Sequence, residues 1–459
     1  MKDSIDFGSM EIPKLFRKLL IPTVLGMVFS AVFVITDGIF VGRGIGSDAL
    51  AAVNITAPLF LISTGVGLMF GVGASVVASI HLAQGKVKAA RINVTQAVAV
   101  SSLLLAAYSF LITSCAREVA LLLGSSERLL PLAVEYMHWF APFLPFSALL
   151  SSGMFFIRLD GSPNYAMLCN AVPAVINIVL DYVFIFILGW GMTGAAAATF
   201  AGRFAGTFYL IKKLRESSEI KLPFFTRPRR GMMRIWGGIT AIGLPVTLTT
   251  GSVAFGMGTV NKILSTTYGN IAVAGWMVGL RVEDLAFNTL MGINDALVPF
   301  LSFNYGRRSL DRMRRGIRSA FIISGVITVA IGLALAFAPH PIINLFRPTE
   351  EVAAVAIQSI RITIAGYPMV IYSVLYNALF IATGYSGYGL VIQVCRSMVL
   401  RVPAVWLLAG MVSIHWIWLF QPISFAGAAA LTWLFSWILL KKLRKDMAGN
   451  STEMGPYIR

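Results

Sequence analysis

A long apolar run near the amino terminus, Ile21 to Val53, contains one acid inside its apolar part, Asp37. The run exceeds the roughly 20 apolar residues that a helix needs to cross the hydrocarbon core of a bilayer. A charged Asp at the bilayer centre costs about 2.5–3.5 kcal/mol on insertion scales. A chain tolerates that cost only where the carboxyl group has a partner, a water-filled cavity or a function. Asp37 is therefore the first candidate functional residue.

Apolar runs of similar length recur throughout the 459 residues, and only 12% of the residues are charged. A soluble domain has about 25% charged residues, so the composition predicts an all-α integral membrane protein. We expect twelve transmembrane helices, at roughly 15–40, 48–80, 93–115, 131–157, 164–188, 192–213, 236–262, 271–303, 316–338, 354–382, 387–411 and 424–442.

The basic residues are distributed unevenly over the predicted loops. Of the 37 Lys and Arg residues, 27 lie in the amino terminus, the carboxyl tail and alternate loops, and only four lie on the opposite side. Because basic loops stay in the cytoplasm, both termini are predicted to be cytoplasmic, in a multi-pass protein of the cell (inner) membrane. The net charge of +17 thus indicates topology and contact with membrane lipids, and does not indicate nucleic-acid binding.

The second half of the chain repeats the first at a nearly constant offset. The Ile-Pro-Thr at 21–23 matches Leu-Pro-Val at 244–246, and Pro145 matches Pro368, both at an offset of 223 residues. A looser match joins the Gln-Gly at 84–85 to the Tyr-Gly at 305–306, at an offset of 221. An offset this regular indicates an internal duplication.

The duplication predicts two pseudo-symmetric six-helix bundles with the same orientation in the membrane. The amino-terminal lobe covers 1–213, a cytoplasmic linker covers 214–235, and the carboxyl-terminal lobe with a short tail covers 236–459. Because each half has an even number of crossings, the two halves should be related by an axis along the membrane normal, as in known transporters.

Polar residues in the predicted fifth span lie on one stripe of the helix. Asn170, Asn177 and Asp181 are seven and four residues apart. At about 1.5 Å per residue, Asp37, Asp181 and Thr199 reach similar depths in the outer half of the membrane. Carboxylate, amide and hydroxyl oxygens suit a hard cation or a shared proton, and do not suit zinc. We therefore predict a cation- or proton-coupling site.

Simpler interpretations of these residues remain open. Asp37 precedes a glycine near a helix end and could be a solvated residue at the outer rim. Asn177 could join two helices by a hydrogen bond without any role in transport. Arg203, four residues after Thr199, could be the resident counter-ion of Asp37 or Asp181, which would make the cluster partly structural.

The second half has a different set of charges. Glu283, Asp284 and Asp295 lie on the predicted eighth span and could contact substrate or belong to a charge network. Adjacent residues cannot share a helix face, so Glu283 and Asp284 should point apart. One could pair with Lys262 or Arg281, and we favour such a structural ion pair over a second functional site.

The sequence contains no clustered histidine, cysteine or serine set for catalysis or for a resident metal. The chain is therefore not predicted to be an enzyme, and no cofactor is expected beyond the coupling ion, H⁺ or Na⁺, at Asp37, Asn177, Asp181 and Thr199. The expected partners are a small organic substrate and membrane lipids, and the expected functional state is a monomer.

Nearly the whole chain resembles the multidrug and toxic compound extrusion (MATE) family, and its DinF-like prokaryotic branch in particular. The resemblance rests on the 21–53 run, on GVGASVVASIHLAQGKVKAAR, on NIVLD and GMTGAAAAT, and on NYGRRSLDR. It implies antiport, in which a cation enters down its gradient and a bulky, cationic or amphipathic compound leaves by alternating access of two lobes. Matched residue by residue, the branch's coupling site falls on Asp37, Asn177, Asp181 and Thr199.

Three departures from the family pattern affect this interpretation. Tyr182 stands where a proline commonly follows the fifth-span Asp, which puts a kink there in doubt. The seventh span lacks the acid that the NorM-like branch uses shortly after Pro245. Arg203 is not part of the pattern and would weaken a metal-ion site in favour of proton coupling.

The alternative function is a flippase or exporter of lipid-linked saccharides from the same superfamily. Such proteins often have a more basic central cavity. The alternative rests on five arginines in or near the spans, Arg203, Arg281, Arg361, Arg396 and Arg401.

Overall fold

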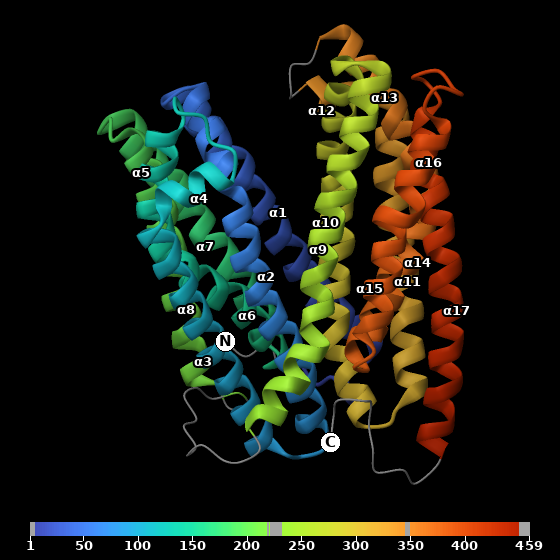
Figure 1. Ribbon diagram of the computed structural model, residues 1–459. Helices are drawn as coiled ribbons and strands as arrows, with labels where there is room; N and C mark the ends of the chain where they lie inside the picture. The colour runs from blue at the N-terminus through green and yellow to red at the C-terminus, as the bar shows by residue number, and fades with distance from the viewer. Residues whose placement is uncertain (1–4, 218–219, 221–231, 345–348, 449–459) are drawn as a thin grey trace. The chain divides into compact units, whose positions relative to one another are not determined.

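The computed structural model describes residues 5–217, 220, 232–344 and 349–448, and their regular structure is helical (Figure 1). Most of the predicted linker, 214–235, lies outside the described residues. The helices are α1 (Ile12–Gly44), α2 (Ser47–Ala83), α3 (Val87–Ser114), α4 (Ala116–Leu122), α5 (Leu130–Phe140), α6 (Leu144–Leu159), α7 (Pro163–Asp181), α8 (Gly191–Glu216), α9 (Met232–Tyr268), α10 (Asn270–Gly306), α11 (Leu310–Phe337), α12 (His340–Ile343), α13 (Glu350–Ala365), α14 (Tyr367–Ala382), α15 (Ser386–Val394), α16 (Arg401–Leu408) and α17 (Phe420–Ala448).

Each of the twelve predicted spans falls on one long helix or on consecutive helical segments. The paired segments are α5 with α6, α13 with α14, and α15 with α16. Among the described residues, eight helical stretches are long and apolar enough to cross a membrane, or nine if the bent pair α13–α14 counts as one span. The predicted all-α membrane fold class is confirmed.

Proline and glycine positions explain where the broken spans bend. A 3₁₀ turn at Ala141–Phe143 separates α5 from α6, and Pro142 and Pro145 lie at this junction. Proline lacks an N–H group and so interrupts the helical hydrogen-bond ladder. Gly366 and Pro368 stand at the equivalent break, where α13 and α14 meet at 57°.

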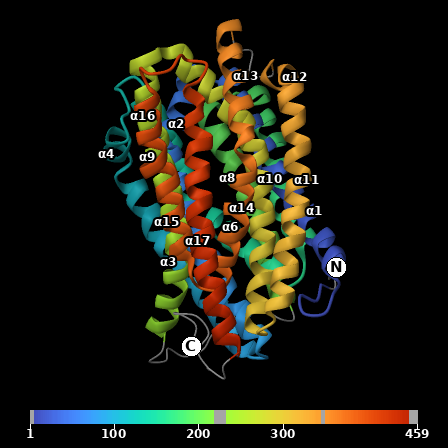
Figure 2. The same cartoon turned by 90° about the vertical axis from the view of Figure 1, so that its right-hand side faces the viewer.

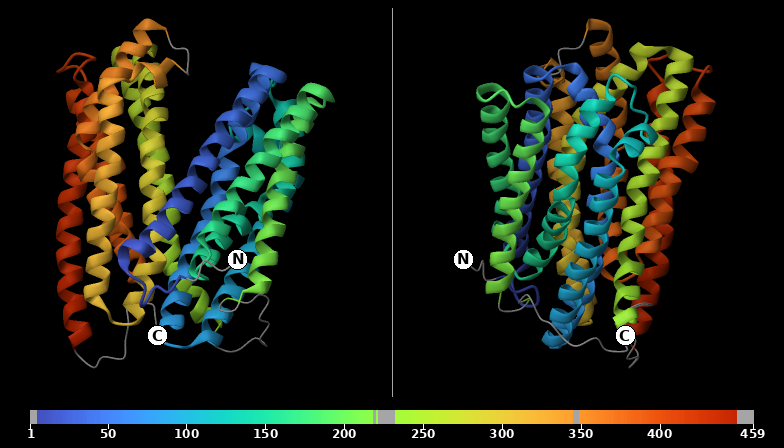
Figure 3. Two further views of the ribbon diagram at one scale, coloured as in Figure 1. Left: turned by 180° about the vertical axis from the view of Figure 1, so that it is seen from behind. Right: turned by 60° about the vertical axis from the view of Figure 1, so that its left-hand side comes forward.

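The chain divides into two compact units. The first contains Met1–Met10 and Arg17–Gly243, and the second contains Glu11–Phe16 and Leu244–Arg459. In the first unit, α2 packs against α6 and α3, and α7 packs against α8 (Figure 3). In the second unit, α10 packs against α13 and α14, and α14 packs against α17 (Figure 2).

Glycines allow α2 and α6 to approach closely in the first unit. A Cβ added at Gly67 would lie 3.0 Å from the Ala148 Cα, and one at Gly71 would lie 2.6 Å from the Ser152 Cα. Membrane helices lack a hydrophobic driving force toward each other, so small residues that permit such close contact stabilise their packing. The glycine-rich sequence of α2 is therefore explained by helix packing.

The helix boundaries reproduce the internal repeat. Paired helices begin at Ser47 and Asn270, at Val87 and Leu310, and at Leu144 and Tyr367, each pair 223 residues apart (270−47, 310−87, 367−144). The duplication predicted from the sequence thus extends to the helices themselves.

The loop between the second and third spans corrects one sequence match. Gly85 has a φ of 74°, and the residue with the equivalent positive φ of 55° is Arg308, not Gly306. The offset is therefore 223 here too (308−85), and the predicted 221 match was wrong. The loop geometry was retained although the glycine was not, so a search for matching glycines found the wrong residue.

Candidate functional site

Three helices of the first unit bring the predicted coupling residues together: α1 carries Asp37, α7 carries Asn177 and Asp181, and α8 carries Thr199. Close contact between these helices depends on glycine. A Cβ at Gly202 of α8 would lie 2.8 Å from the Pro173 carbonyl oxygen of α7. The sequence of small residues on α8 thus places its Thr199 against the polar stripe of α7.

Asp37 and Asp181 form a carboxyl pair, which is the central feature of the site. Their side chains meet in a hydrogen-bond contact, although Asp37 is half-buried and Asp181 is fully buried, with 0% exposed. Two ionised carboxylates offer only acceptor oxygens, so this contact is a hydrogen bond only when one group carries a proton. With both groups ionised, neither Asp181 oxygen has a hydrogen-bond donor of good geometry among the described residues.

Asn177 and Thr199 extend the carboxyl pair into a polar cluster. The Asn177 Nδ2 donates to the Thr199 Oγ1 at 3.3 Å, and Thr199 donates to the Ala195 carbonyl at 3.1 Å. The Asn177 Oδ1 is buried and accepts no hydrogen bond from a described residue. An unpaired buried acceptor is costly, so this oxygen is available to a proton donor or a cation.

A small cavity opens beside this cluster. Asn170, Asn177, Thr199 and Arg203 line it together with apolar residues of α1 and α7. About 10 Å³ within it is open to the centre of a water-sized sphere, which is room for about one water molecule or ion. The structure therefore brings together all four predicted coupling residues and adds Asn170 to their surroundings.

Arg203 lies between two aromatic rings. Its guanidinium carbon is 5.2 Å from the centre of the Phe33 ring and 5.4 Å from the centre of the Phe60 ring. It interacts electrostatically with Asp37, but no ion pair within 4 Å joins it to either carboxyl group in the described residues. The rings hold Arg203 near the pair, and its charge acts at longer range than in the predicted contact ion pair.

The helix changes its geometry directly after Asp181. Residues Tyr182–Ile187 are π-helical, and the Leu188 N–H donates to the Val183 carbonyl at 2.9 Å, five residues back. Tyr182 replaces the proline that we expected at this point, and the π-helical segment supplies the local irregularity instead. Such segments often occur at functional sites.

The sequence analysis missed Tyr136 of α5. This buried residue interacts electrostatically with Asp37, Asp181 and Arg203, and its ring stacks on Phe140 with centroids 5.4 Å apart. A single tyrosine in an apolar run has no pattern that separates it from core aromatics. Its proximity to the charges was visible only after α5 had been placed beside α8.

The acids of α10 separate in the second unit. Glu283 is buried and Asp284 is exposed, as adjacent positions on a helix predict. The electrostatic neighbour of Asp284 is Arg281, but among the described residues no ion pair within 4 Å joins them. Asp295 lies twelve residues beyond Glu283, about 18 Å along the helix, so the three acids do not form one site.

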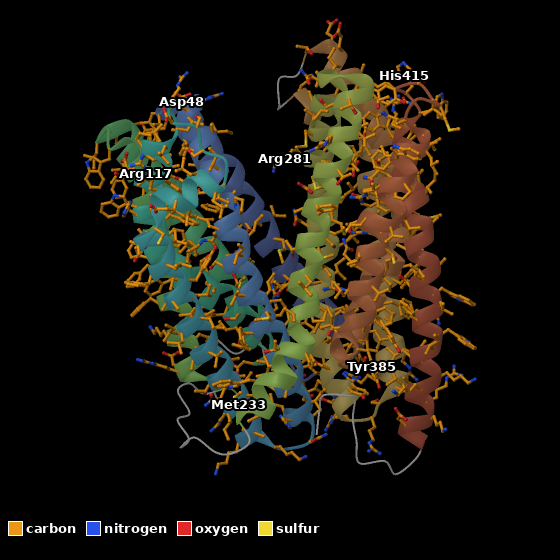
Figure 4. All side chains as sticks on the ribbon, viewed as in Figure 1. Asp48, Arg117, Met233, Arg281, Tyr385 and His415 are labelled. Atoms are coloured by element: carbon orange, nitrogen blue, oxygen red, sulfur yellow. The ribbon has the colours of Figure 1, made fainter. Side chains whose placement is uncertain are left out.

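The predicted pairing of Glu283 is also different. Its electrostatic partner is Arg401, and Lys262 instead lines a separate groove with Trp406 and Met411. Of the five arginines behind the flippase alternative, Arg281 and Arg361 are exposed, and Figure 4 shows Arg281 at the flank of α10. No group of three His, Cys, Asp or Glu residues suited to a metal occurs among the described residues.

Comparisons with known proteins agree with the duplicated architecture. The MatE family model matches residues 22–183 and 245–407, once in each half. The multidrug export protein MepA of Staphylococcus aureus strain N315 is 24% identical over 454 residues, covering 98% of both chains. MepA of Staphylococcus saprophyticus is 25% identical over 434 residues, covering 93% of this chain and 94% of the relative.

Solved structures resemble the fold closely. A crystal structure of "MATE in the straight conformation" has a TM-score of 0.88 at 22% identity, covering 95% of this chain and 98% of that chain. A "MOP superfamily transporter from Pyrococcus furiosus" has a TM-score of 0.87 at 22% identity, covering 95% and 97%. The similarity extends over almost the full length of each chain.

Proposed function

Because the chain belongs to the MatE family, we propose that it is a secondary active antiporter that exports bulky, cationic or amphipathic organic compounds in exchange for H⁺ or Na⁺. The printed names of the MepA relatives support the direction and the substrate class, since they are multidrug export proteins. The observation that carries the proposal is the carboxyl pair of Asp37 and Asp181 inside the first unit.

The carboxyl pair is suited to couple an ion to a conformational change. Two carboxyl groups in contact cannot easily both stay ionised, so the pair exchanges a proton or binds a cation as one unit. A bound ion shifts the first unit between two packings only by its different affinity for them. We infer that this difference drives alternating access to the exported compound.

Two groups near the pair favour different coupling ions. The free Oδ1 of Asn177 and the hydroxyl of Thr199 would complete an oxygen site for Na⁺ together with the carboxylates. The positive charge of Arg203 repels a second cation, which favours a proton instead. The basic loops further support an orientation with both termini in the cytoplasm, and we propose that the monomer is the transporting unit.

Counterflow and gradient-driven efflux in proteoliposomes test this function. A pH gradient and a Na⁺ gradient are imposed separately, and a fluorescent cationic dye reports transport. We expect one of the two gradients to drive dye movement. If neither gradient moves the dye, the antiport proposal is wrong, and uptake of a lipid-linked saccharide analogue then tests the flippase alternative.

A further inference from the structure

The second unit buries two arginines next to each other. Arg396 lies in the π-helical segment Cys395–Leu400, Arg401 begins α16, and they are only 8% and 7% exposed. Each is an electrostatic neighbour of the same surroundings, and the two guanidinium groups repel each other. We call these residues the arginine pair.

The described residues neutralise this pair incompletely. Glu283 of α10 interacts electrostatically with Arg401, but no ion pair within 4 Å involves Glu283 or either arginine among the described residues. The Nε atoms of both arginines are buried and donate no hydrogen bond to a described residue. Two cations thus share one acid, and donors remain available.

The surroundings hold the arginine pair in place without cancelling its charge. The Arg396 guanidinium lies 5.8 Å from the centre of the Phe287 ring and 5.9 Å from the centre of the Phe425 ring. Aromatic rings stabilise a cation by cation–π attraction but accept no strong hydrogen bond. A charged group inside a membrane span is costly and typically lies on a substrate or ion pathway.

We propose that Arg396 and Arg401 form a binding site for an oxyanion, a carboxylate or phosphate group, on the compound that the protein exports. Arginine presents a planar set of N–H donors that matches such groups, often with two parallel hydrogen bonds. The substrate class rests on the proposed export function and narrows it to compounds that carry an anionic group as well as cationic or apolar parts. A lipid headgroup offers the same phosphate chemistry from another source.

Thermal unfolding of the purified protein in detergent tests the site without any gradient. Sodium benzoate, inorganic phosphate and dihexanoyl phosphatidylglycerol are titrated at fixed ionic strength. We expect the first two to raise the unfolding temperature saturably. Stabilisation by phosphatidylglycerol alone would assign the site to a lipid headgroup and overturn its assignment to the exported compound. No stabilisation by any of the three would overturn the site itself.

Substitutions give effects of opposite sign. Arg396→Gln and Arg401→Gln should weaken oxyanion binding by about 10- to 100-fold, because each removes a charge-assisted donor. Glu283→Gln should tighten it, because the acid that repels the ligand is lost. Arg361→Gln is the matched control, because this exposed arginine donates to the Ala336 carbonyl at 3.2 Å elsewhere in the unit.

A purely structural charge network predicts a different pattern. All three substitutions would then destabilise the protein without ligand, and none would change the response to oxyanions, which would overturn the proposal. Arg396→Lys keeps the charge and tests the site where Arg396→Gln does not fold: weak residual binding is expected, and wild-type affinity would contradict arginine recognition. Cationic-dye efflux is measured in parallel. Loss of efflux with retained oxyanion binding refutes only the antiport function.

Discussion

Each unit of the protein places buried charge beside a π-helical segment, and the charges have opposite sign. In the first unit Asp181 directly precedes Tyr182–Ile187, and Asp37 contacts it. In the second unit Arg396 lies within Cys395–Leu400 and Arg401 follows it. The same helical scaffold therefore supports an acidic site in one copy and a basic site in the other.

The positions related by the repeat make the contrast sharper. At an offset of 223 residues, Asp37 corresponds to Val260 (260−37) and Asp181 to Ala404 (404−181). Arg396 corresponds to Pro173 (396−173) in the same alignment. Helix boundaries follow apolar packing and turn residues, which both copies retain, whereas the buried charges do not follow the repeat. We interpret these charges as functional additions to a common scaffold.

The largest expected effect comes from the carboxyl pair. Asp181→Asn and Asp37→Asn should each abolish gradient-driven dye efflux, since the amide keeps the shape and cannot exchange the proton. Folding should be nearly intact, as judged by thermal stability in detergent. Glu283→Gln is the matched control in the second unit and should keep its response to the gradient. Full activity in either aspartate variant would remove the acidic site from the mechanism.

The neutral ligands should have smaller effects on coupling. Asn177→Ala and Thr199→Ala each remove an uncharged group beside the carboxyl pair, so efflux should weaken without being abolished. The apparent affinity for the coupling ion, measured from the dependence of efflux on ion concentration, should fall. Equal losses for Asn177→Ala and Asp181→Asn would show that the amide is as important as the charge.

Arg203 tests whether the aromatic rings or an ion pair hold this cation. Arg203→Ala should lower the stability by about 2 kcal/mol, the value for a desolvated cation–π contact. Thermal unfolding measures the change, and Arg203→Lys should recover part of it. A loss of about 3–5 kcal/mol would instead indicate a buried ion pair with Asp37 or Asp181.

The smallest expected effects concern the paired loops. Gly85→Ala forces a side chain into the left-handed region and should cost about 1 kcal/mol. Arg308→Gly relieves the same constraint in the other copy and should gain at most about 1 kcal/mol. Because the side chain of Arg308 has an interaction of its own, the net gain should be smaller than the Gly85 loss. Changes of the same sign would contradict the equivalence of the two loops.

Much of this architecture was predictable from the sequence because the rules are local. Apolar length located the spans, and helical spacing with depth brought Asp37, Asn177, Asp181 and Thr199 to one place. The assignment to the MATE family is confirmed at the family level, while the DinF-like branch stays a prediction.

Other features depend on packing between distant segments. The rings of Phe33 and Phe60 that enclose Arg203 come from two different helices, and no local pattern connects them. Spacing alone could separate Glu283 from Asp284 but could not say which one faces the protein interior. The missing proline at Tyr182 gave no sign that a π-helical segment would replace it.

The π-helical segment also determines how the end of the fifth span can move. Such a segment holds one more residue than the same length of α-helix, so its conversion would rotate the following backbone by about 100°. Gly189 and Gly191, with φ values of 67° and 56°, follow within a few residues and tolerate backbone rotation that other residues resist. A twist beginning next to Asp181 would therefore end in this loop, and α8 would keep its position.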